Sequence, residues 1–124
     1  MKQILFILTL AILTSCTKDR SMVNDVSGVW LLTIETLEVE LTLNQAGTKL
    51  TGTYDFIYAS NETLTLLPES NIVGNDVTFA YVLPSGTKDT FTGTVNVDFD
   101  FIKGIRKTTA NPSTKNWEAH KINN

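Results

Sequence analysis

The stretch from residue 41 to residue 56 constrains the fold more than any other, because it holds two alternating segments and the polar link between them. Apolar or small residues occupy every second position in residues 41–44 and in residues 50–56, which is the period of a β-strand with one solvent-exposed face. The link, residues 44–48, contains Gly47 and predicts a β-hairpin turn. The rest of the chain repeats this design.

Eight alternating segments are predicted, and turn-forming Gly, Asn, Asp or Pro residues separate most of them. The predicted strands are residues 29–36, 39–44, 49–56, 62–67, 76–82, 89–97, 101–107 and 116–122. No segment repeats apolar residues at helical spacing over three turns, so the sequence indicates an all-β domain. Short links favour antiparallel neighbours, and we expect an eight-stranded antiparallel up-and-down (meander) barrel. A Greek-key sandwich is the competing architecture.

A short glycine motif recurs in three of the predicted strands. Its copies are Leu50-Thr51-Gly52-Thr53, Phe91-Thr92-Gly93-Thr94 and Ile102-Lys103-Gly104-Ile105. In each copy the glycine lies two positions after a large apolar residue and therefore on the same face of the strand. Such a glycine lets a strand coil sharply or lets another side chain lie across it, as barrel closure requires. The alternative is that these are unrelated glycines of edge strands.

The start of the chain has the pattern of an export signal. Lys2 precedes an apolar run, residues 4–13, that is too short to span a bilayer, so we expect residues 1–15 to be a cleaved signal peptide. The run ends in Leu13-Thr14-Ser15-Cys16, which resembles the lipobox of bacterial lipoproteins. This resemblance implies that Cys16 is acylated and anchors the mature chain in a membrane. The alternative is an ordinary secretory signal with a coincidental cysteine.

The same resemblance implies a location and a domain organisation. Thr17 stands where an aspartate usually retains Gram-negative lipoproteins in the inner membrane, so the outer membrane is expected. The lipidated Cys16 and a polar tether would occupy residues 16–27, and the barrel domain residues 28–124. The chain carries 13 acidic and 10 basic residues. This balance argues against a nucleic-acid partner, which requires a clustered basic face.

Two short segments near the ends of the predicted domain carry a second resemblance. Gly28-Val29-Trp30 opens the first strand, and Trp117-Glu118-Ala119-His120-Lys121 lies in the last. Together with Leu50-Thr51-Gly52-Thr53-Tyr54, they resemble the calycin superfamily of eight-stranded barrels, which includes lipocalins and avidins. The resemblance implies that Trp30 closes one end of the barrel and that Lys121, in the place of an arginine, lies over the Trp30 ring.

Within this superfamily, the avidin pattern is only partly present. Tyr54 and Trp117 match two biotin-contacting positions of avidins, but Leu32 occupies the position of a biotin-binding asparagine. A shared fold does not carry the ligand when much of the site is replaced. Biotin binding is therefore not expected.

Strand alternation predicts an interior ligand site. Tyr54, Tyr81 and Arg106 share the inward parity of their apolar strand neighbours. Two phenols and a guanidinium around a mostly apolar cavity would suit a small anionic or amphipathic ligand. With Trp117, they are the candidate ligand-binding residues. The alternative is that Arg106 lies at the barrel rim with its charge in water.

Catalysis is not expected, and neither is a metal ion or other cofactor. The chain has one histidine, His120, on the outward parity of its strand, and its one cysteine is the lipidation residue, so no nucleophile–base pair or metal triad is present. The leading expectation is non-catalytic binding of a small or amphipathic molecule. The alternatives are a side-chain-filled barrel that contacts an envelope protein partner, or an inhibitor whose loops at residues 57–61 or 84–88 enter another protein's cleft.

Overall fold

The computed structural model describes residues 25–57 and 62–123, and all regular structure in these ranges is β-strand. The strands are β1 (Gly28–Ile34), β2 (Leu37–Ala46), β3 (Lys49–Phe56), β4 (Thr63–Thr65), β5 (Asn71–Val73), β6 (Asp76–Val82), β7 (Lys88–Val95), β8 (Phe101–Thr108) and β9 (Asn111–Asn123). Across the same ranges, no helix has the length and hydropathy needed to cross a membrane.

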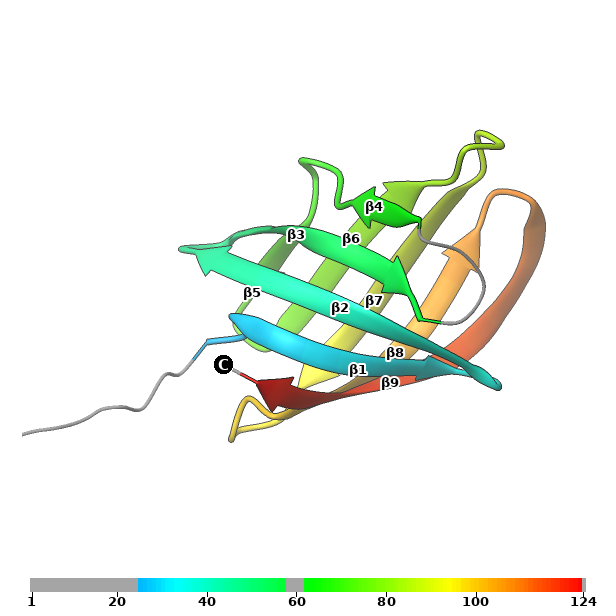
Figure 1. Ribbon diagram of the computed structural model, residues 1–124. Coiled ribbons are helices and arrows are strands. Elements are labelled where there is room, and N and C mark those ends of the chain that lie inside the picture. The colour runs from blue at the N-terminus through cyan, green and yellow to red at the C-terminus, as the bar shows by residue number, and fades with distance from the viewer. Residues whose placement is uncertain (1–24, 58–61, 124) are drawn as a thin grey trace, which may run out of the picture.

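The strands form a closed antiparallel barrel in which sequence neighbours lie side by side (Figure 1). Pairing runs from β1 to β3 and from β6 to β9, and β9 returns to β1. The short β4 and β5 share one position between β3 and β6, because Tyr54 is opposite Leu64 of β4 and Lys49 is opposite Asn71 of β5. The predicted all-β, eight-stranded up-and-down barrel is therefore confirmed, and this strand order excludes the Greek-key sandwich.

Two strands, β5 and β9, differ from the sequence-based predictions by more than a shift of a few residues at their ends. The alternation does not predict β5, because Asn71 and Gly74 bound it and both favour turns. The last strand begins at Asn111 instead of residue 116, although Pro112 cannot donate a backbone hydrogen bond. Residues 111–116 pair with β8 alone, since β1 pairs with β9 only from Trp117 onward. Pro112 thus lies on an unpaired edge, where a sheet tolerates proline.

Alternate residues of each strand point into the barrel and form its core. In β1, for example, Trp30, Leu32 and Ile34 are buried, as the period of a strand requires. Six aromatic side chains are buried in the interior: Trp30, Tyr54, Phe79, Tyr81, Phe91 and Trp117. Each contributes roughly 1.5–3 kcal/mol of hydrophobic stabilisation or more. The protein's own side chains therefore fill most of the interior.

The motif glycines allow neighbouring strands to approach closely. Gly52 has a φ of +151°, and a Cβ built on it would lie 1.8 Å from the carbonyl oxygen of Thr42 on β2. A Cβ on Gly104 would lie 1.8 Å from the carbonyl oxygen of Thr92 on β7. Close backbone approach, and not an edge position, therefore explains these glycines, as predicted for barrel closure.

We name the two ends of the barrel from the position of Asp25, the first described residue. The near end carries Asp25, the β5–β6 turn, the loop between β7 and β8, and the last residues of β9 (Figure 1). The far end carries the β1–β2, β6–β7 and β8–β9 turns. At the near end Val26 is 0% exposed, and its carbonyl accepts a hydrogen bond from Trp30 Nε1 at 3.0 Å. The folded domain therefore starts before the expected boundary at residue 28.

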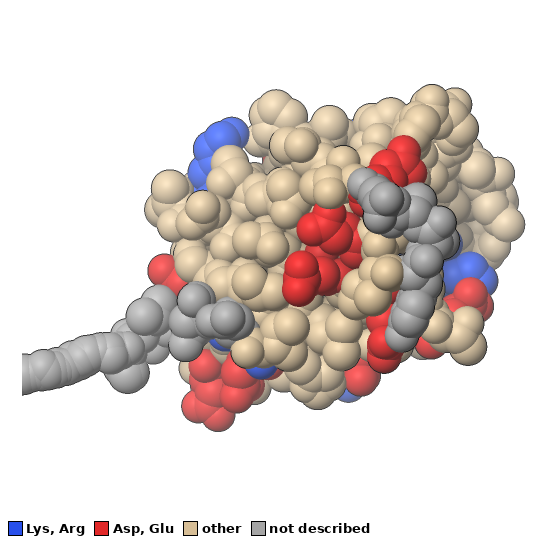
Figure 2. All heavy atoms as spheres, viewed as in Figure 1, with Lys and Arg blue, Asp and Glu red and all other residues tan. Residues whose placement is uncertain are grey.

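On the face shown in Figure 2, acidic side chains outnumber basic ones, and the basic ones are scattered. This distribution follows the composition of 13 acidic and 10 basic residues. A polyanion would be repelled by such a face.

Candidate functional site

Aromatic side chains from four strands make contact inside the barrel. The ring centroids of Tyr54 and Tyr81 are 4.4 Å apart, and those of Tyr54 and Phe91 are 5.6 Å apart. Phe91 stacks on Phe79 at 4.8 Å and meets Trp117 edge-on at 5.5 Å. Such ring pairs contribute about 0.5–1.5 kcal/mol each beyond their buried area. Three of the four predicted ligand residues, Tyr54, Tyr81 and Trp117, thus belong to one aromatic cluster.

A buried acid lies beside this cluster toward the far end. Asp89 is 5% exposed, and the Tyr81 hydroxyl donates a hydrogen bond to its Oδ2 at 2.9 Å. Burial raises the pKa of Tyr81, so the phenol remains protonated and able to donate. Asp89 is not among the site residues predicted from the sequence. The available signal was its parity with Phe91, which places both side chains on the inner face of β7.

The second phenol is also withdrawn from water. Tyr54 is 1% exposed, and burial raises its pKa to about 12, with a smaller opposing effect from the positive charge of Arg106. Both phenols therefore stay neutral at physiological pH. They form a polar but uncharged inner wall near Arg106.

Arg106 and Trp117 present hydrogen-bond donors that lack acceptors. Arg106 is half-buried on the inner parity of β8, its Nε is buried without a partner, and it forms no ion pair with any residue in the described ranges. Trp117 is 3% exposed, and its Nε1 is likewise buried without a partner. Because Arg106 is opposite Lys115 on β9, Trp117 is its diagonal neighbour on the same face. Arg106 is thus neither fully interior nor fully solvated. Its position is intermediate between the two predicted alternatives, an interior site and the barrel rim.

The indole of Trp117 lies across two glycines. Gly104 is opposite Trp117 on one side and opposite Gly93 on the other. A Cβ on Gly93 would lie 2.9 Å from Trp117 Cζ2, so larger residues would push the ring away. The glycine motif therefore positions one of the predicted ligand residues.

The near end is closed by the contact that the calycin resemblance implies. Lys121 Nζ lies 5.3 Å from the centroid of the Trp30 ring and donates a hydrogen bond to the Asp25 carbonyl at 3.2 Å. Burial lowers the pKa of Lys121, while the charges of Asp25 and Asp100 oppose this shift. A cation on the ring face compensates part of the lost hydration. This cation–π contact and the buried Trp30 therefore cover the near end of the interior.

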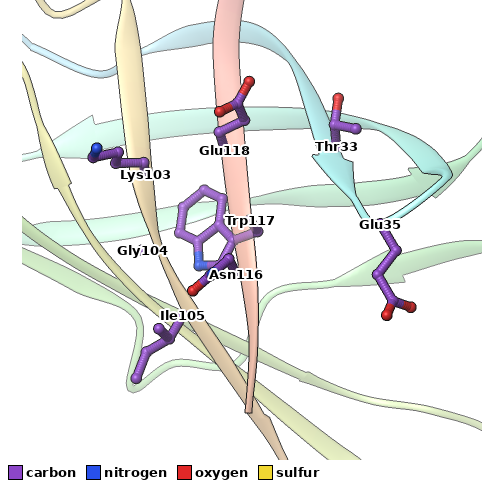
Figure 3. A pocket seen from close by; sticks show the side chains of 8 residues that line it. All are labelled: Thr33, Glu35, Lys103, Gly104, Ile105, Asn116, Trp117 and Glu118. Atoms are coloured by element: carbon purple, nitrogen blue, oxygen red, sulfur yellow. The ribbon is translucent and has the colours of Figure 1, made fainter.

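A groove of about 580 Å³ lies on the outer wall of the barrel over β1, β8 and β9. It is lined by Thr33, Glu35, Lys103, Gly104, Ile105, Asn116, Trp117 and Glu118 (Figure 3). The Trp117 indole appears between β8 and β9, where Gly104 has no side chain to cover it. Glu35 at one margin forms an ion pair with Lys115 at 2.8 Å, and this contact lowers the pKa of Glu35.

Some predicted features lie beyond what the structure describes. Cys16, the expected lipidation residue, and residues 58–61 of one proposed inhibitory loop are outside the described residues. In residues 25–57 and 62–123, no group of three or more His, Cys, Asp or Glu side chains is arranged to hold a metal ion. His120 is exposed beside Glu118, with Nε2 and Oε2 3.5 Å apart.

Comparisons with known proteins address the fold alone. No family model matches this chain, and no curated protein matches it significantly. A solved structure described as a redesigned β-barrel is similar to it, with a TM-score of 0.51 and 14% sequence identity. The match covers 78% of this chain and 91% of that chain. At this identity, the likeness supports the barrel architecture and carries no function.

Proposed function

We propose that this protein is a lipid-anchored envelope protein that binds an amphipathic anion at the far end of its barrel, without catalysis. The observation that carries the proposal is Arg106, a half-buried cation with an unpartnered Nε and no ion pair among the described residues. Glu35 is within electrostatic range of this guanidinium but forms its ion pair with Lys115. Leaving the buried Nε donor without an acceptor is costly. A carboxylate head group would supply that acceptor and can accept two hydrogen bonds from one guanidinium.

The far end also offers apolar surface for the rest of such a ligand. Leu37 and Phe56 lie at this end of β2 and β3, and Leu83 directly follows β6. All three are only partly buried against the core. Partly exposed apolar side chains around one charged group are typical of a site for an amphipathic molecule. The neutral phenols of Tyr54 and Tyr81 lie deeper and would not repel an anion.

A thermal-shift experiment with dodecanoate tests the binding proposal. We expect dodecanoate to raise the melting temperature of the wild-type domain, because a ligand that binds only the folded state stabilises it by mass action. Arg106→Gln should lose this shift. Lys107→Gln, on the exposed face of the same strand, is the matched control and should retain it. Equal shifts in both variants would overturn the assignment of Arg106.

The anchor is supported by the lipobox-like residues, and the described part of the chain indicates which end of the barrel it would hold. Residues 13–16 carry the resemblance, and Asp25 lies at the near end, opposite the proposed ligand site. The ligand site would therefore face away from the membrane. Cys16→Ser should abolish labelling by a palmitate analogue and release a folded protein from membranes. Retention of the variant in the membrane would contradict lipid anchoring at Cys16.

A second candidate function is protein interaction, and the filled interior favours it. Tyr54, Phe79, Phe91 and Trp117 are in ring contact inside the barrel, whereas the 580 Å³ groove is on the outer wall. An envelope protein would bind there. A photo-crosslinking residue at Ile105, which lines the groove, should then give a discrete adduct in the host envelope. Val82, of similar exposure on β6, is the control position and should give none.

A further inference from the structure

The three most exposed large apolar side chains among the described residues all lie at the near end of the barrel. Val97 is 84% exposed in the loop between β7 and β8, Val73 is 63% exposed at the end of β5, and Ile122 is 57% exposed near the end of β9. Single exposed aliphatic residues are common on protein surfaces. Their concentration at one end of the molecule indicates an interaction surface.

Hydrogen bonds join the segments that carry these side chains. The backbone N–H of Lys121 donates to the Asp100 carbonyl, which links the end of β9 to the β7–β8 loop. The N–H of Val95, the last residue of β7 before this loop, donates to the Asn75 carbonyl in the β5–β6 turn. Within the loop, the Asn96 side-chain oxygen accepts hydrogen bonds from two backbone N–H groups. These hydrogen bonds therefore hold the segments that carry the three apolar side chains together at the near end.

The described chain begins at this same end. Lys121 Nζ donates a hydrogen bond to the Asp25 carbonyl at 3.2 Å. Cys16 precedes Asp25 by nine residues, and nine residues span at most about 32 Å. A lipid anchor at Cys16 would thus keep the near end within reach of the lipid headgroups.

We propose that the near-end rim, defined by Val73, Val97 and Ile122, rests on the lipid surface in which Cys16 is anchored. The inference depends on the lipid anchor of the proposed function. The anchor holds the rim at high local concentration beside the bilayer, so a few aliphatic side chains at the headgroup–acyl boundary are enough to orient the domain. The far end then opens away from the membrane.

The charges around the rim determine which lipids favour docking. Asp76, Asp98 and Asp100 lie in the near-end turns and strand ends. Of the cations at this end, Lys121 is held by Trp30 and the Asp25 carbonyl. Lys49 donates a hydrogen bond to the Pro68 carbonyl. The rim is therefore net acidic, and we expect stronger docking on zwitterionic phosphatidylcholine than on vesicles containing phosphatidylglycerol.

The test uses the full-length acylated protein in phosphatidylcholine vesicles. Since Cys16 is the one cysteine of the chain, Val97→Cys provides a single free thiol for an environment-sensitive fluorophore. Ser85→Cys, exposed in the far-end β6–β7 turn, is the matched control. We expect blue-shifted emission and quenching by headgroup-proximal brominated lipids at position 97, and neither at position 85. Adding Val73→Ser and Ile122→Ser should reduce the blue shift at position 97.

The outcomes separate docking from anchoring. Solvent-like emission at both positions, in protein that floats with the vesicles and carries acyl chains by intact mass, would overturn docking and leave the anchor intact. Protein without acyl chains that fails to float would overturn both. A larger blue shift on phosphatidylglycerol-containing vesicles would overturn docking through an acidic, apolar rim.

Discussion

Asp89 is buried and Arg106 is half-buried on the inner wall of the barrel, and only Asp89 has a hydrogen-bond partner for its buried polar atoms. Asp89 accepts a hydrogen bond from the Tyr81 hydroxyl, whereas Arg106 Nε has no acceptor. Leaving a buried polar group unpaired costs about 1–3 kcal/mol. Arg106 therefore departs from the arrangement that favours stability alone, as residues at binding sites commonly do.

The Tyr81–Asp89 hydrogen bond should contribute measurably to stability. Tyr81→Phe keeps the ring but leaves the buried Asp89 carboxyl without its donor, so we expect the free energy of unfolding to fall by about 1–3 kcal/mol. Urea denaturation followed by tryptophan fluorescence measures the change. Tyr54→Phe, which leaves the Tyr81–Asp89 bond intact, is the control and should cost less. Equal losses in the two variants would contradict this assignment.

The buried phenols predict loss of stability in alkali. Burial raises the pKa of Tyr54 to about 12, whereas an unfolded tyrosine has a pKa of about 10. Between these values the unfolded chain releases a proton that the folded chain retains, so the free energy of unfolding falls as the pH rises. Each pKa unit corresponds to about 1.4 kcal/mol.

The measurement is urea denaturation at several pH values from 9 upward. Tyr54→Phe should flatten the decline in stability above pH 10, because the variant lacks the shifted phenol. A decline of the same steepness in the variant would show that other groups cause the alkaline loss.

At the scale of the elements, three neighbouring strands depend on one another through their glycines. β7 and β8 place Gly93 opposite Gly104, and β9 lays the Trp117 indole over both. The missing side chains allow the strands to coil tightly, and the indole fills the space that results. The position of Trp117, and hence of its unpartnered Nε1, is therefore a property of the three strands together.

Gly104→Ala tests this arrangement. Its Cβ would lie 1.8 Å from the Thr92 carbonyl oxygen, so β7 and β8 must separate, and we expect a loss of at least about 3 kcal/mol in unfolding free energy. Gly47→Ala is the control, because its Cβ would meet nothing within 4 Å although φ is +65°. That variant should cost about 1–2 kcal/mol. Thermal unfolding compares the two, and similar melting temperatures would argue against a close strand contact at Gly104.

At the scale of the whole molecule, closure joins the two ends of the domain. β1 pairs with β9, so that Ile34 lies opposite Trp117, and the barrel is incomplete until the last strand is in place. Val26 then fills the near end beneath Trp30. Such non-local pairing makes the folding transition cooperative and slow, because long loops must close before the contacts form.

The burial of Val26 at the near end predicts where the minimal stable domain begins. A fragment that starts at Gly28 lacks the buried Val26 and leaves Trp30 Nε1 without its acceptor, so we expect it to be at least about 2 kcal/mol less stable than a fragment that starts at Asp25. Calorimetric melting of both fragments measures the difference. If both melt at the same temperature, Val26 does not contribute to closing the barrel.

Much of the barrel could be predicted because alternation is a local property. β3 and β6 have the predicted bounds, and strand alternation correctly predicted that Tyr54 and Tyr81 point inward. β5 and the start of β9 could not be predicted, since Asn71 and Pro112 favour turns locally. Pairing of β5 with β3 and β6, and of β9 with β8, holds these segments in strands. Neighbouring strands overrode the local preference.

Local sequence patterns predict the all-β class, the inward face of most strands and most of the turns, because a two-residue period and turn chemistry act over a few residues. Which side chains meet depends on the tertiary structure. Tyr81 bonds Asp89, Lys121 covers Trp30, and the donors of Arg106 and Trp117 remain unpartnered. These relations depend on strand register and closure around the whole barrel, which no local pattern encodes.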